Sequence, residues 1–127
     1  MEDTTRHFRL GDVEAYRISF ALSNCVWDAV VCWNYLAQNT VGSQFIRAVD
    51  SVSANLAEGF GRYGKKDKIK FYRIARGSLM EALDWNEKAK ARQLLTPEQY
   101  GHIFTQLQLL PKSINTLIKY TNTSLKE

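Results

Sequence analysis

The sequence is poor in the residues that mark several protein classes. Its 127 residues include only 2 Cys, 2 His, 2 Pro and 7 Gly. Cys25 and Cys32 stand seven residues apart on a predicted helix, about 10 Å along its axis, which is too far for a disulfide between them. We expect both thiols to be buried as small hydrophobes. Neither histidine lies near a cysteine, so no zinc-type spacing is present and no metal is expected. The low glycine and proline content excludes collagen-like and low-complexity chains.

Long apolar runs are also missing. No stretch of about 18 apolar residues occurs, so no segment is predicted to span a membrane. Residues 1–5 are acidic and polar, without the basic flank and apolar stretch of a secretory signal. These absences predict a cytoplasmic protein.

The residues that are present provide enough apolar surface for one core. Hydrophobic residues make up 45% of the chain, and they include 3 Trp, 6 Tyr and 6 Phe. A chain of this length most often forms one domain, and its folding buries roughly two-thirds of the unfolded surface. We therefore expect a single domain over residues 1–127.

The apolar residues recur at helical spacing, and no alternating strand pattern of convincing length occurs. Thr96 can cap a helix, Pro97 suits its first position and Gln99 completes a capping box, which is typical of a helix start. Pro111 is expected to bend the helix that follows. The sequence predicts an all-α, left-handed, up-down-up-down four-helix bundle. Its helices are expected at about 12–36, 43–60, 65–92 and 97–120, with a turn at 39–43 and a frayed tail at 121–127.

The predicted helix at 12–36 carries two apolar stripes instead of one. They consist of Val13, Tyr16, Phe20, Trp27 and Val31, and of Ile18, Leu22, Ala29, Trp33 and Leu36. Two stripes make a helix apolar over more than the sector that faces a core. We therefore expect part of this helix to contact another subunit.

Basic residues are concentrated in one part of the chain. The net charge is +4, and 7 of the 17 Lys and Arg residues fall within residues 62–76, where Asp67 is the one acid. Tyr63, Phe71 and Tyr72 alternate with these charges, a combination that can bind phosphates and stack on unpaired bases. Nucleic-acid contact is one interpretation, and a solvated or internally paired surface is the other. The basic residues are Arg62, Lys65, Lys66, Lys68, Lys70, Arg73 and Arg76.

The glycine-rich segment 59–64 formally matches a dinucleotide-binding fingerprint, and with Lys65 it is close to a phosphate-binding loop. Both motifs need a preceding strand at the edge of a parallel sheet, whereas an amphipathic helix precedes this segment. We therefore interpret it as a hairpin between two helices.

A polar line follows the predicted helix 43–60, made of Gln44, Ser51, Asn55, Glu58 and Arg62. Folding about the glycine hairpin is expected to place Ser51 opposite Arg76, Asn55 opposite Tyr72, and Glu58 near Ile69 and Arg73. An interhelical hydrogen-bond network explains such a line, because buried polar groups need partners. A general acid at Glu58 is the alternative, but no nucleophile, second carboxylate or metal ligand accompanies it. Small residues on the following helix predict close helix approach: Ala75, Gly77, Ser78 and Ala82.

The centre of the chain resembles a known family. Its residues 42–62 include the pattern Ser-x-x-x-Asn-x-x-Glu-Gly, and residues 75–81 read Ala-Arg-Gly-Ser-Leu-Met-Glu. Together with residues 66–71, these segments resemble the bacterial four-helix-bundle proteins encoded in intervening sequences of 23S ribosomal RNA genes. The accessory variability determinant of diversity-generating retroelements is similar to the same family. The match is strong over about residues 42–81 and looser in the first and last helices.

The resemblance implies a homo-oligomer, a pentameric ring of bundles, with a basic surface that contacts RNA or a partner such as a reverse transcriptase. It implies no catalytic residues and no cofactor. The signature positions are Ser51, Asn55, Glu58, Gly59, Gly77, Ser78 and Glu81, which we interpret as packing and register residues. Positions that are often basic in the family are Arg47, Arg62, Arg73 and Arg76. We expect a non-enzymatic protein that binds structured RNA or an RNA/DNA hybrid, with a protein–protein adaptor as the alternative.

Overall fold

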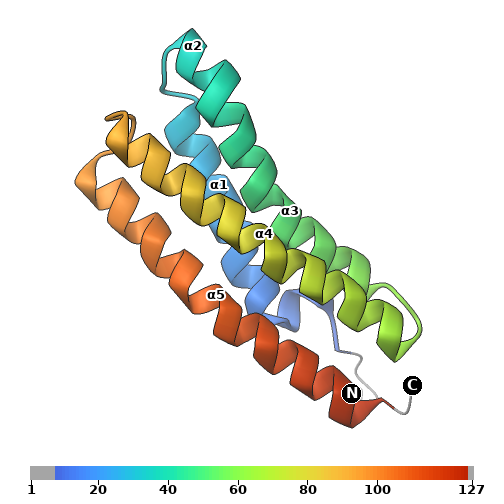
Figure 1. Ribbon diagram of the computed structural model, residues 1–127. Coiled ribbons are helices and arrows are strands. Elements are labelled where there is room, and N and C mark those ends of the chain that lie inside the picture. The colour runs from blue at the N-terminus through green and yellow to red at the C-terminus, as the bar shows by residue number, and fades with distance from the viewer. Residues whose placement is uncertain (1–7, 126–127) are drawn as a thin grey trace, which may run out of the picture.

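The computed structural model describes residues 8–125, which are helical apart from short connections (Figure 1). No strand occurs within that range, as the helical spacing of the apolar residues predicts. The long helices are α1 (Glu14–Val30), α3 (Ser43–Phe60), α4 (Lys65–Ala91) and α5 (Pro97–Ser124). The short elements are a 3-10 turn at Leu10–Asp12, α2 (Tyr35–Ala37) and a π-helical segment at Gln38–Gly42.

Each long helix packs on two others in a four-sided arrangement. The packed pairs are α1 with α3, α3 with α4, α4 with α5, and α5 with α1. Consecutive long helices run in opposite directions: Ser51 on α3 contacts Ser78 on α4, and Lys65 at the start of α4 reaches Asn122 at the end of α5. As a result, α1 and α4 lie diagonally opposite each other.

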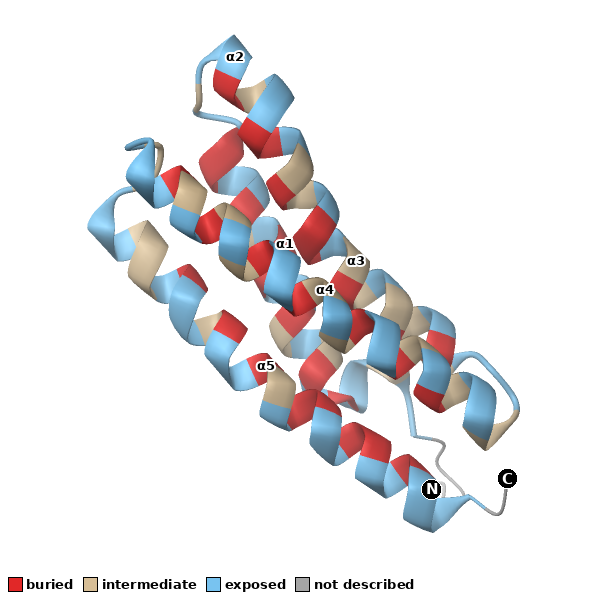
Figure 2. Ribbon diagram, in the orientation of Figure 1, coloured by how far each residue is buried: buried red, intermediate tan, exposed pale blue. Residues whose placement is uncertain are grey.

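The core follows the apolar stripes that the sequence shows. On α5 the fully buried residues keep a 3–4 spacing, which places them on one helix face. Figure 2 shows these buried positions turned toward the other helices, with exposed residues on the outer faces. The buried α5 residues of this stripe are Ile103, Leu107, Leu110 and Ile114, and those of α3 are Phe45, Val49, Val52 and Leu56.

The first predicted helix ends earlier than its apolar pattern indicates. It stops at Val30, and a new helix begins after Asn34, whose side chain accepts a hydrogen bond from the Ala37 N–H at 2.9 Å. Asparagine favours this capping position, so it starts a new helix where periodicity alone would continue the old one. Because α1 has ended there, Cys32 is exposed and the expectation of two buried thiols is wrong for it, while Cys25 is half-buried.

The turn predicted at 39–43 is instead helical. Residues Gln38–Gly42 form a π-helical segment that joins α2 to α3 without a break. The Gln38 amide donates hydrogen bonds to the carbonyls of Val30 and Val31, both at 3.1 Å, and so ties this segment to the end of α1. The non-helical part of the connection between α1 and α3 is therefore residues 31–34.

Helix α5 begins where the sequence predicts but ends later. The capping box is confirmed: the Gln99 N–H donates to Thr96 Oγ1 at 3.0 Å, and the Thr96 N–H donates to Gln99 Oε1 at 2.9 Å. The helix runs through Pro111 without interruption to Ser124, so the tail predicted to fray at 121–127 is helical as far as that residue. Thr121 is buried, which explains the extra turn. Residues 126 and 127 lie outside the described range.

Tyr72 gives the fold a sensitivity to alkaline pH. Its side chain is 2% exposed, and burial raises the pKa of Tyr72 to about 12. Above pH 10 the unfolded chain loses this phenolic proton while the folded chain keeps it, so stability falls as the pH rises toward 12. At pH 11 the expected loss is about 1.4 kcal/mol, since one pKa unit corresponds to about 1.36 kcal/mol. Urea unfolding at pH 9 to 11 should show a smaller fall in the free energy of unfolding for Tyr72→Phe than for the wild type. Equal falls in the two proteins would assign the effect to another group.

Candidate nucleic-acid interface

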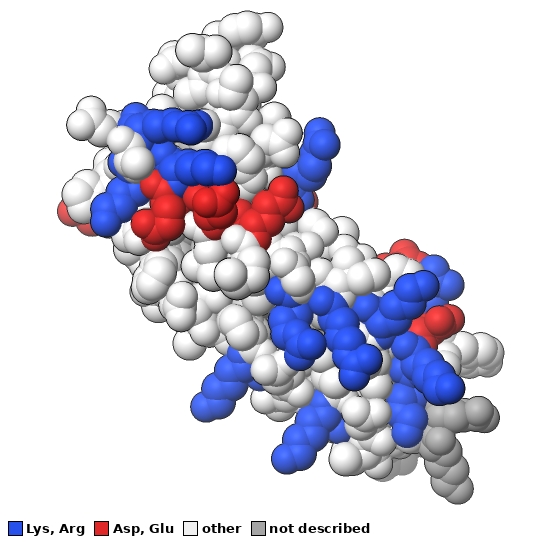
Figure 3. Space-filling view, in the orientation of Figure 1, with Lys and Arg blue, Asp and Glu red and all other residues white. Residues whose placement is uncertain are grey.

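A basic groove lies between the first turns of α4 and the last turns of α5. It is an open hollow of about 590 Å³ lined by Lys65, Lys66, Ile69, Lys70, Arg73 and Asn122. The Lys65 ammonium donates to the Asn122 carbonyl at 3.2 Å and so ties the two helices together. Figure 3 shows basic side chains gathered over this end of the molecule.

The charges of the groove are not neutralised by nearby acids. Within residues 8–125 the ion pairs are Arg62 with Glu58 and Lys88 with Asp84, and neither involves a groove residue. Four cations of α4 therefore share one surface beside α5, and none of them forms a described ion pair. Such a surface attracts polyanions, and it does so more strongly at low ionic strength.

Helix α5 extends the basic surface in a way that the sequence did not reveal. Arg76 donates a hydrogen bond to the Asn115 side-chain oxygen, next to the groove. Lys112 and Lys119 are exposed, each three residues before an asparagine of α5 that contacts α4. Residues three apart are neighbours on a helix surface, so these lysines flank the groove. The sequence does hold a signal for them. Pairing the apolar faces of the last two helices in antiparallel order places the end of α5 beside the start of α4.

Three of the residues predicted to bind nucleic acid lie elsewhere. The Lys68 ammonium donates to the Phe60 carbonyl at 2.7 Å, and partial burial lowers the pKa of Lys68. Arg62 pairs with Glu58 at 2.9 Å and lies over the Phe71 ring, 4.7 Å from its centre. Arg47 lies near the start of α3, thirteen residues before its last residue, Phe60, and so about 20 Å along the helix from the hairpin. The groove and its edge therefore hold five of the eight predicted residues: Lys65, Lys66, Lys70, Arg73 and Arg76.

The aromatic residues among these charges have different surroundings. Tyr72 is buried in the core, so the prediction that it stacks on bases is wrong. Phe71 is half-buried beneath Arg62 and Lys70. Tyr63 is fully exposed at the hairpin between α3 and α4, where its ring is free to stack on an unpaired base.

The polar line on α3 forms part of the predicted network. Ser51 and Ser78 share a hydrogen bond of 2.9 Å between α3 and α4, and the Asn55 amide donates to the Ser51 carbonyl at 2.8 Å and to its hydroxyl at 3.1 Å. Ser51 thus lies opposite Ser78, two residues beyond the predicted Arg76. Glu58 is exposed and pairs with Arg62 at 2.9 Å instead of joining this network.

The signature residues fall into two groups. Gly59 is buried, and a Cβ there would lie 2.8 Å from the Tyr72 ring and 2.9 Å from the Lys68 carbonyl, so it is a packing residue as predicted. Gly77 is exposed, and a Cβ there would meet nothing within 4 Å. Close helix approach therefore explains Gly59 but not Gly77. Glu58 and Glu81 are exposed as well, which leaves Ser51, Gly59 and Ser78 as the signature residues at the contact of α3 with α4, and Asn55 as the residue that holds Ser51.

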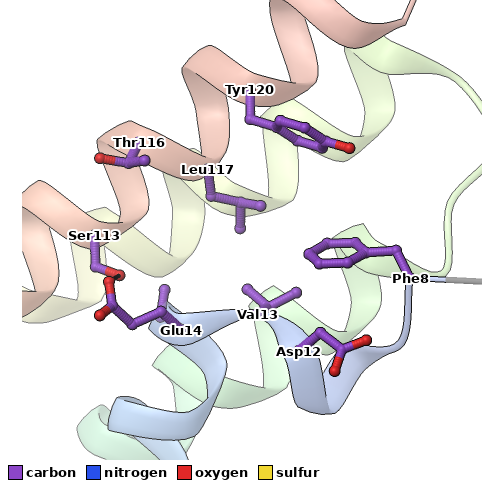
Figure 4. Close-up of a pocket in the computed structure, with 9 residues that line it drawn as sticks. Phe8, Asp12, Val13, Glu14, Ser113, Thr116, Leu117 and Tyr120 are labelled. Atoms are coloured by element: carbon purple, nitrogen blue, oxygen red, sulfur yellow. Dashed lines mark hydrogen bonds between the residues drawn. The ribbon is translucent and has the colours of Figure 1, made fainter.

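A second cavity, of about 260 Å³, lies between the start of the described chain and α5 (Figure 4). Phe8, Val13, Leu117 and Tyr120 give it mostly apolar walls. Ser113 donates a hydrogen bond to Glu14 Oε1 at 3.2 Å on one side of it. These contacts hold the N-terminal segment against α5.

Neither a metal site nor a membrane-spanning helix is found in the described part of the chain. No group of three or more His, Cys, Asp or Glu side chains within residues 8–125 is placed to hold a metal ion. Across the same residues, no helix combines the length and the apolar character needed to cross a membrane.

Comparisons with known proteins agree with this architecture. The profile of a family described as 23S rRNA-intervening sequence protein matches residues 11–116. A crystal structure of a protein of unknown function, from the S23 ribosomal protein family of Bacteroides thetaiotaomicron VPI-5482, superposes with a TM-score of 0.72 at 21% identity. The superposition covers 83% of this chain and 98% of that one, and it shows a shared fold. No curated protein sequence matches the chain.

Proposed function

The chain belongs to the 23S rRNA-intervening sequence protein family, and we propose that it is a non-enzymatic, oligomeric protein that binds structured RNA. The observation that carries the proposal is the basic groove between α4 and α5, in which Lys65, Lys66, Lys70 and Arg73 share one surface. Exposed Lys112 and Lys119 extend it.

Phosphate contacts supply most of the affinity in this proposal. Lysine and arginine bind the RNA backbone as charges and release its counterions, so binding weakens steeply as salt increases. Lys66, Lys70 and Arg73 are exposed and form no described ion pair, so they are available to phosphates. Tyr63 adds a stacking surface at the hairpin, which favours RNA with unpaired bases beside a helix.

A salt titration with a matched variant tests RNA binding. The variant Lys66→Ala/Lys70→Ala/Arg73→Ala removes three exposed groove charges. Three phosphate contacts lower the slope of log affinity against log salt by about 2.7, so between 50 and 200 mM salt the wild type should lose about 40-fold more affinity than the variant. Fluorescence anisotropy with a labelled RNA stem–loop measures both slopes.

The control removes the same number of positive charges elsewhere. Arg47→Ala/Lys90→Ala/Arg92→Ala changes exposed residues outside the groove and should retain most of the wild-type slope. Equal slopes for the two triple variants would mean that the net charge of the protein, and not the groove, accounts for the binding. Absence of binding by the wild type at 50 mM salt would discard RNA binding and leave the adaptor.

The oligomeric part of the proposal is supported by the outer face of α1. Phe20, Trp27 and Val31 are each at least 50% exposed, and they belong to one of the two predicted stripes. Contiguous exposed apolar side chains of this kind mark interaction surfaces. A second copy of the chain is the occupant we propose, and the family resemblance implies five copies in a ring. The same face supports the alternative function, a protein adaptor, which a partner recovered after nuclease treatment would favour.

A further inference from the structure

The exposed ridge of α4 carries opposite charges on its two halves. Lys70 and Arg73 precede Gly77, and Glu81 and Asp84 follow it, all exposed. At 100° per residue these positions lie within about 40° of Gly77 around the helix, so they form one line. In Figure 3 the basic side chains over the start of α4 are separated from a group of acidic ones further along the molecule.

Apolar side chains flank the middle of this ridge. Ile74 is 43% exposed and Met80 is 70% exposed, one on each side of Gly77. Both side chains lie about 60° from Gly77 around the helix, on the face opposite to the buried residues of α4. Water therefore covers two large apolar side chains at the centre of a charged helix face.

Gly77 has no explanation within the bundle. It lies in the interior of a helix, its φ is not positive, and a Cβ would meet nothing within 4 Å. A glycine at an exposed helical position costs about 1 kcal/mol of stability relative to alanine. A helix from outside the bundle would benefit from the missing side chain, because small residues at a crossing let two helix axes come closer.

We propose that the α4 ridge binds the α4 ridge of a second copy of this chain, antiparallel, about a two-fold axis through Gly77. In such a contact residue 77−n of one copy faces residue 77+n of the other. Lys70 then lies level with Asp84 and Arg73 level with Glu81, within reach of long side chains, while Ile74 and Met80 line the two edges of the ridge. The sequence of the ridge is therefore complementary to itself, which is the requirement for a two-fold interface.

Symmetry doubles each of these pairs. Every charge pair occurs twice, giving four opposite-charge pairs around a central pair of glycines, with the Ile74 and Met80 side chains along the edges. At the outer rim Lys66 faces Lys88, and Asp84, which pairs with Lys88 at 2.6 Å on its own helix, is then shared with Lys70 of the second copy. The rim pair is exposed and lysine side chains are long, so the two ammonium groups can diverge into water.

This contact is separate from the other surfaces. Helix α1 lies diagonally across the bundle from α4, so its apolar stripe stays accessible when α4 is covered. The contact does not require RNA. It does cover Lys70 and Arg73, so RNA in the groove and a second copy on the ridge compete for these two side chains.

Charge exchange tests the pairing. The mass of the full-length protein is measured by sedimentation equilibrium over a range of concentrations at 50 mM salt, without nucleic acid. Arg73→Glu and Glu81→Arg each place like charges opposite one another twice, so each should weaken the two-fold association at least tenfold. The double variant Arg73→Glu/Glu81→Arg restores opposite charges across the axis and should return the association to within threefold of wild type.

A steric variant checks the axis. Gly77→Leu places two leucines against each other at the centre and should weaken association at least tenfold without lowering the melting temperature. Trp27→Glu alters only the α1 stripe, so the α4 variants should show the same relative effects in its background. Three results would overturn the proposal: a monomeric wild type at 100 μM, single charge variants that associate like wild type, or a double variant as weak as the singles. Because RNA is absent throughout, none of these results decides whether the groove binds RNA.

Discussion

Phe45→Ala is expected to lower the free energy of unfolding by about 3–5 kcal/mol. Phe45 is completely buried on α3 and is among the largest fully buried side chains of the core. Removing its ring takes away the apolar area that it buries and leaves a cavity that the surrounding helices cannot fill completely. Domains of this size are stable by about 5–15 kcal/mol, so the variant should lose a large share of its stability.

Urea unfolding followed by circular dichroism measures this loss, and Phe104→Ala provides the control. Phe104 is 38% exposed on α5, so the same change there should cost much less, about 1 kcal/mol. If both variants lost the same amount, Phe45 would not occupy the closed core site that the structure gives it.

Gly59→Ala and Gly77→Ala are expected to change stability in opposite directions. At Gly59 the new methyl group would lie 2.9 Å from a backbone carbonyl and 2.8 Å from the Tyr72 ring, so α3 and α4 must move apart. Overpacking of this kind typically costs about 1–3 kcal/mol. At Gly77 the methyl group meets open space, and alanine is the better helix former by about 1 kcal/mol.

Thermal melts at low protein concentration test this pair, because dilution keeps association between copies from contributing. The melting temperature should fall for Gly59→Ala and rise by several degrees for Gly77→Ala. A fall for both variants would mean that Gly77 is in contact within a single chain, which the structure contradicts. Opposite shifts would show that two glycines of one family signature serve different purposes.

Much of the helical organisation follows from local signals in the sequence. The capping box at Thr96 and the buried stripe of α5 predict that helix correctly from its first residue. The break after Val30 was missed because the apolar spacing continues through it, while the signal that ends the helix is the single capping residue Asn34. The π-helical segment was missed for a related reason: Gly42 is compatible with a turn, and only its packing beside Val30 shows otherwise.

The site was predictable in part. The sequence shows where basic residues cluster, but it does not show which way each side chain points. Lys65, Lys66, Lys70 and Arg73 were found because they cluster in the chain, and they share the groove. Lys68 belongs to the same cluster, yet it faces the end of α3, where a carbonyl accepts its hydrogen bond.

Lys112 and Lys119 needed a different kind of information. They lie about forty to fifty residues further along the chain, and only the antiparallel packing of α5 on α4 brings them to the groove. Contacts of this range depend on the register between helices. A residue's charge in the sequence does not supply that register.

The long helices hold the two ends of the bundle at a fixed distance from each other. The groove lies where α4 begins and α5 ends, whereas α2 lies at the opposite end (Figure 1). The 28 residues of α5 span about 42 Å at 1.5 Å per residue. At the far end Tyr35 and Leu36 are 81% and 73% exposed. A bundle anchored by its groove would therefore hold this apolar tip some 40 Å from the anchoring point, at a height set by helix length.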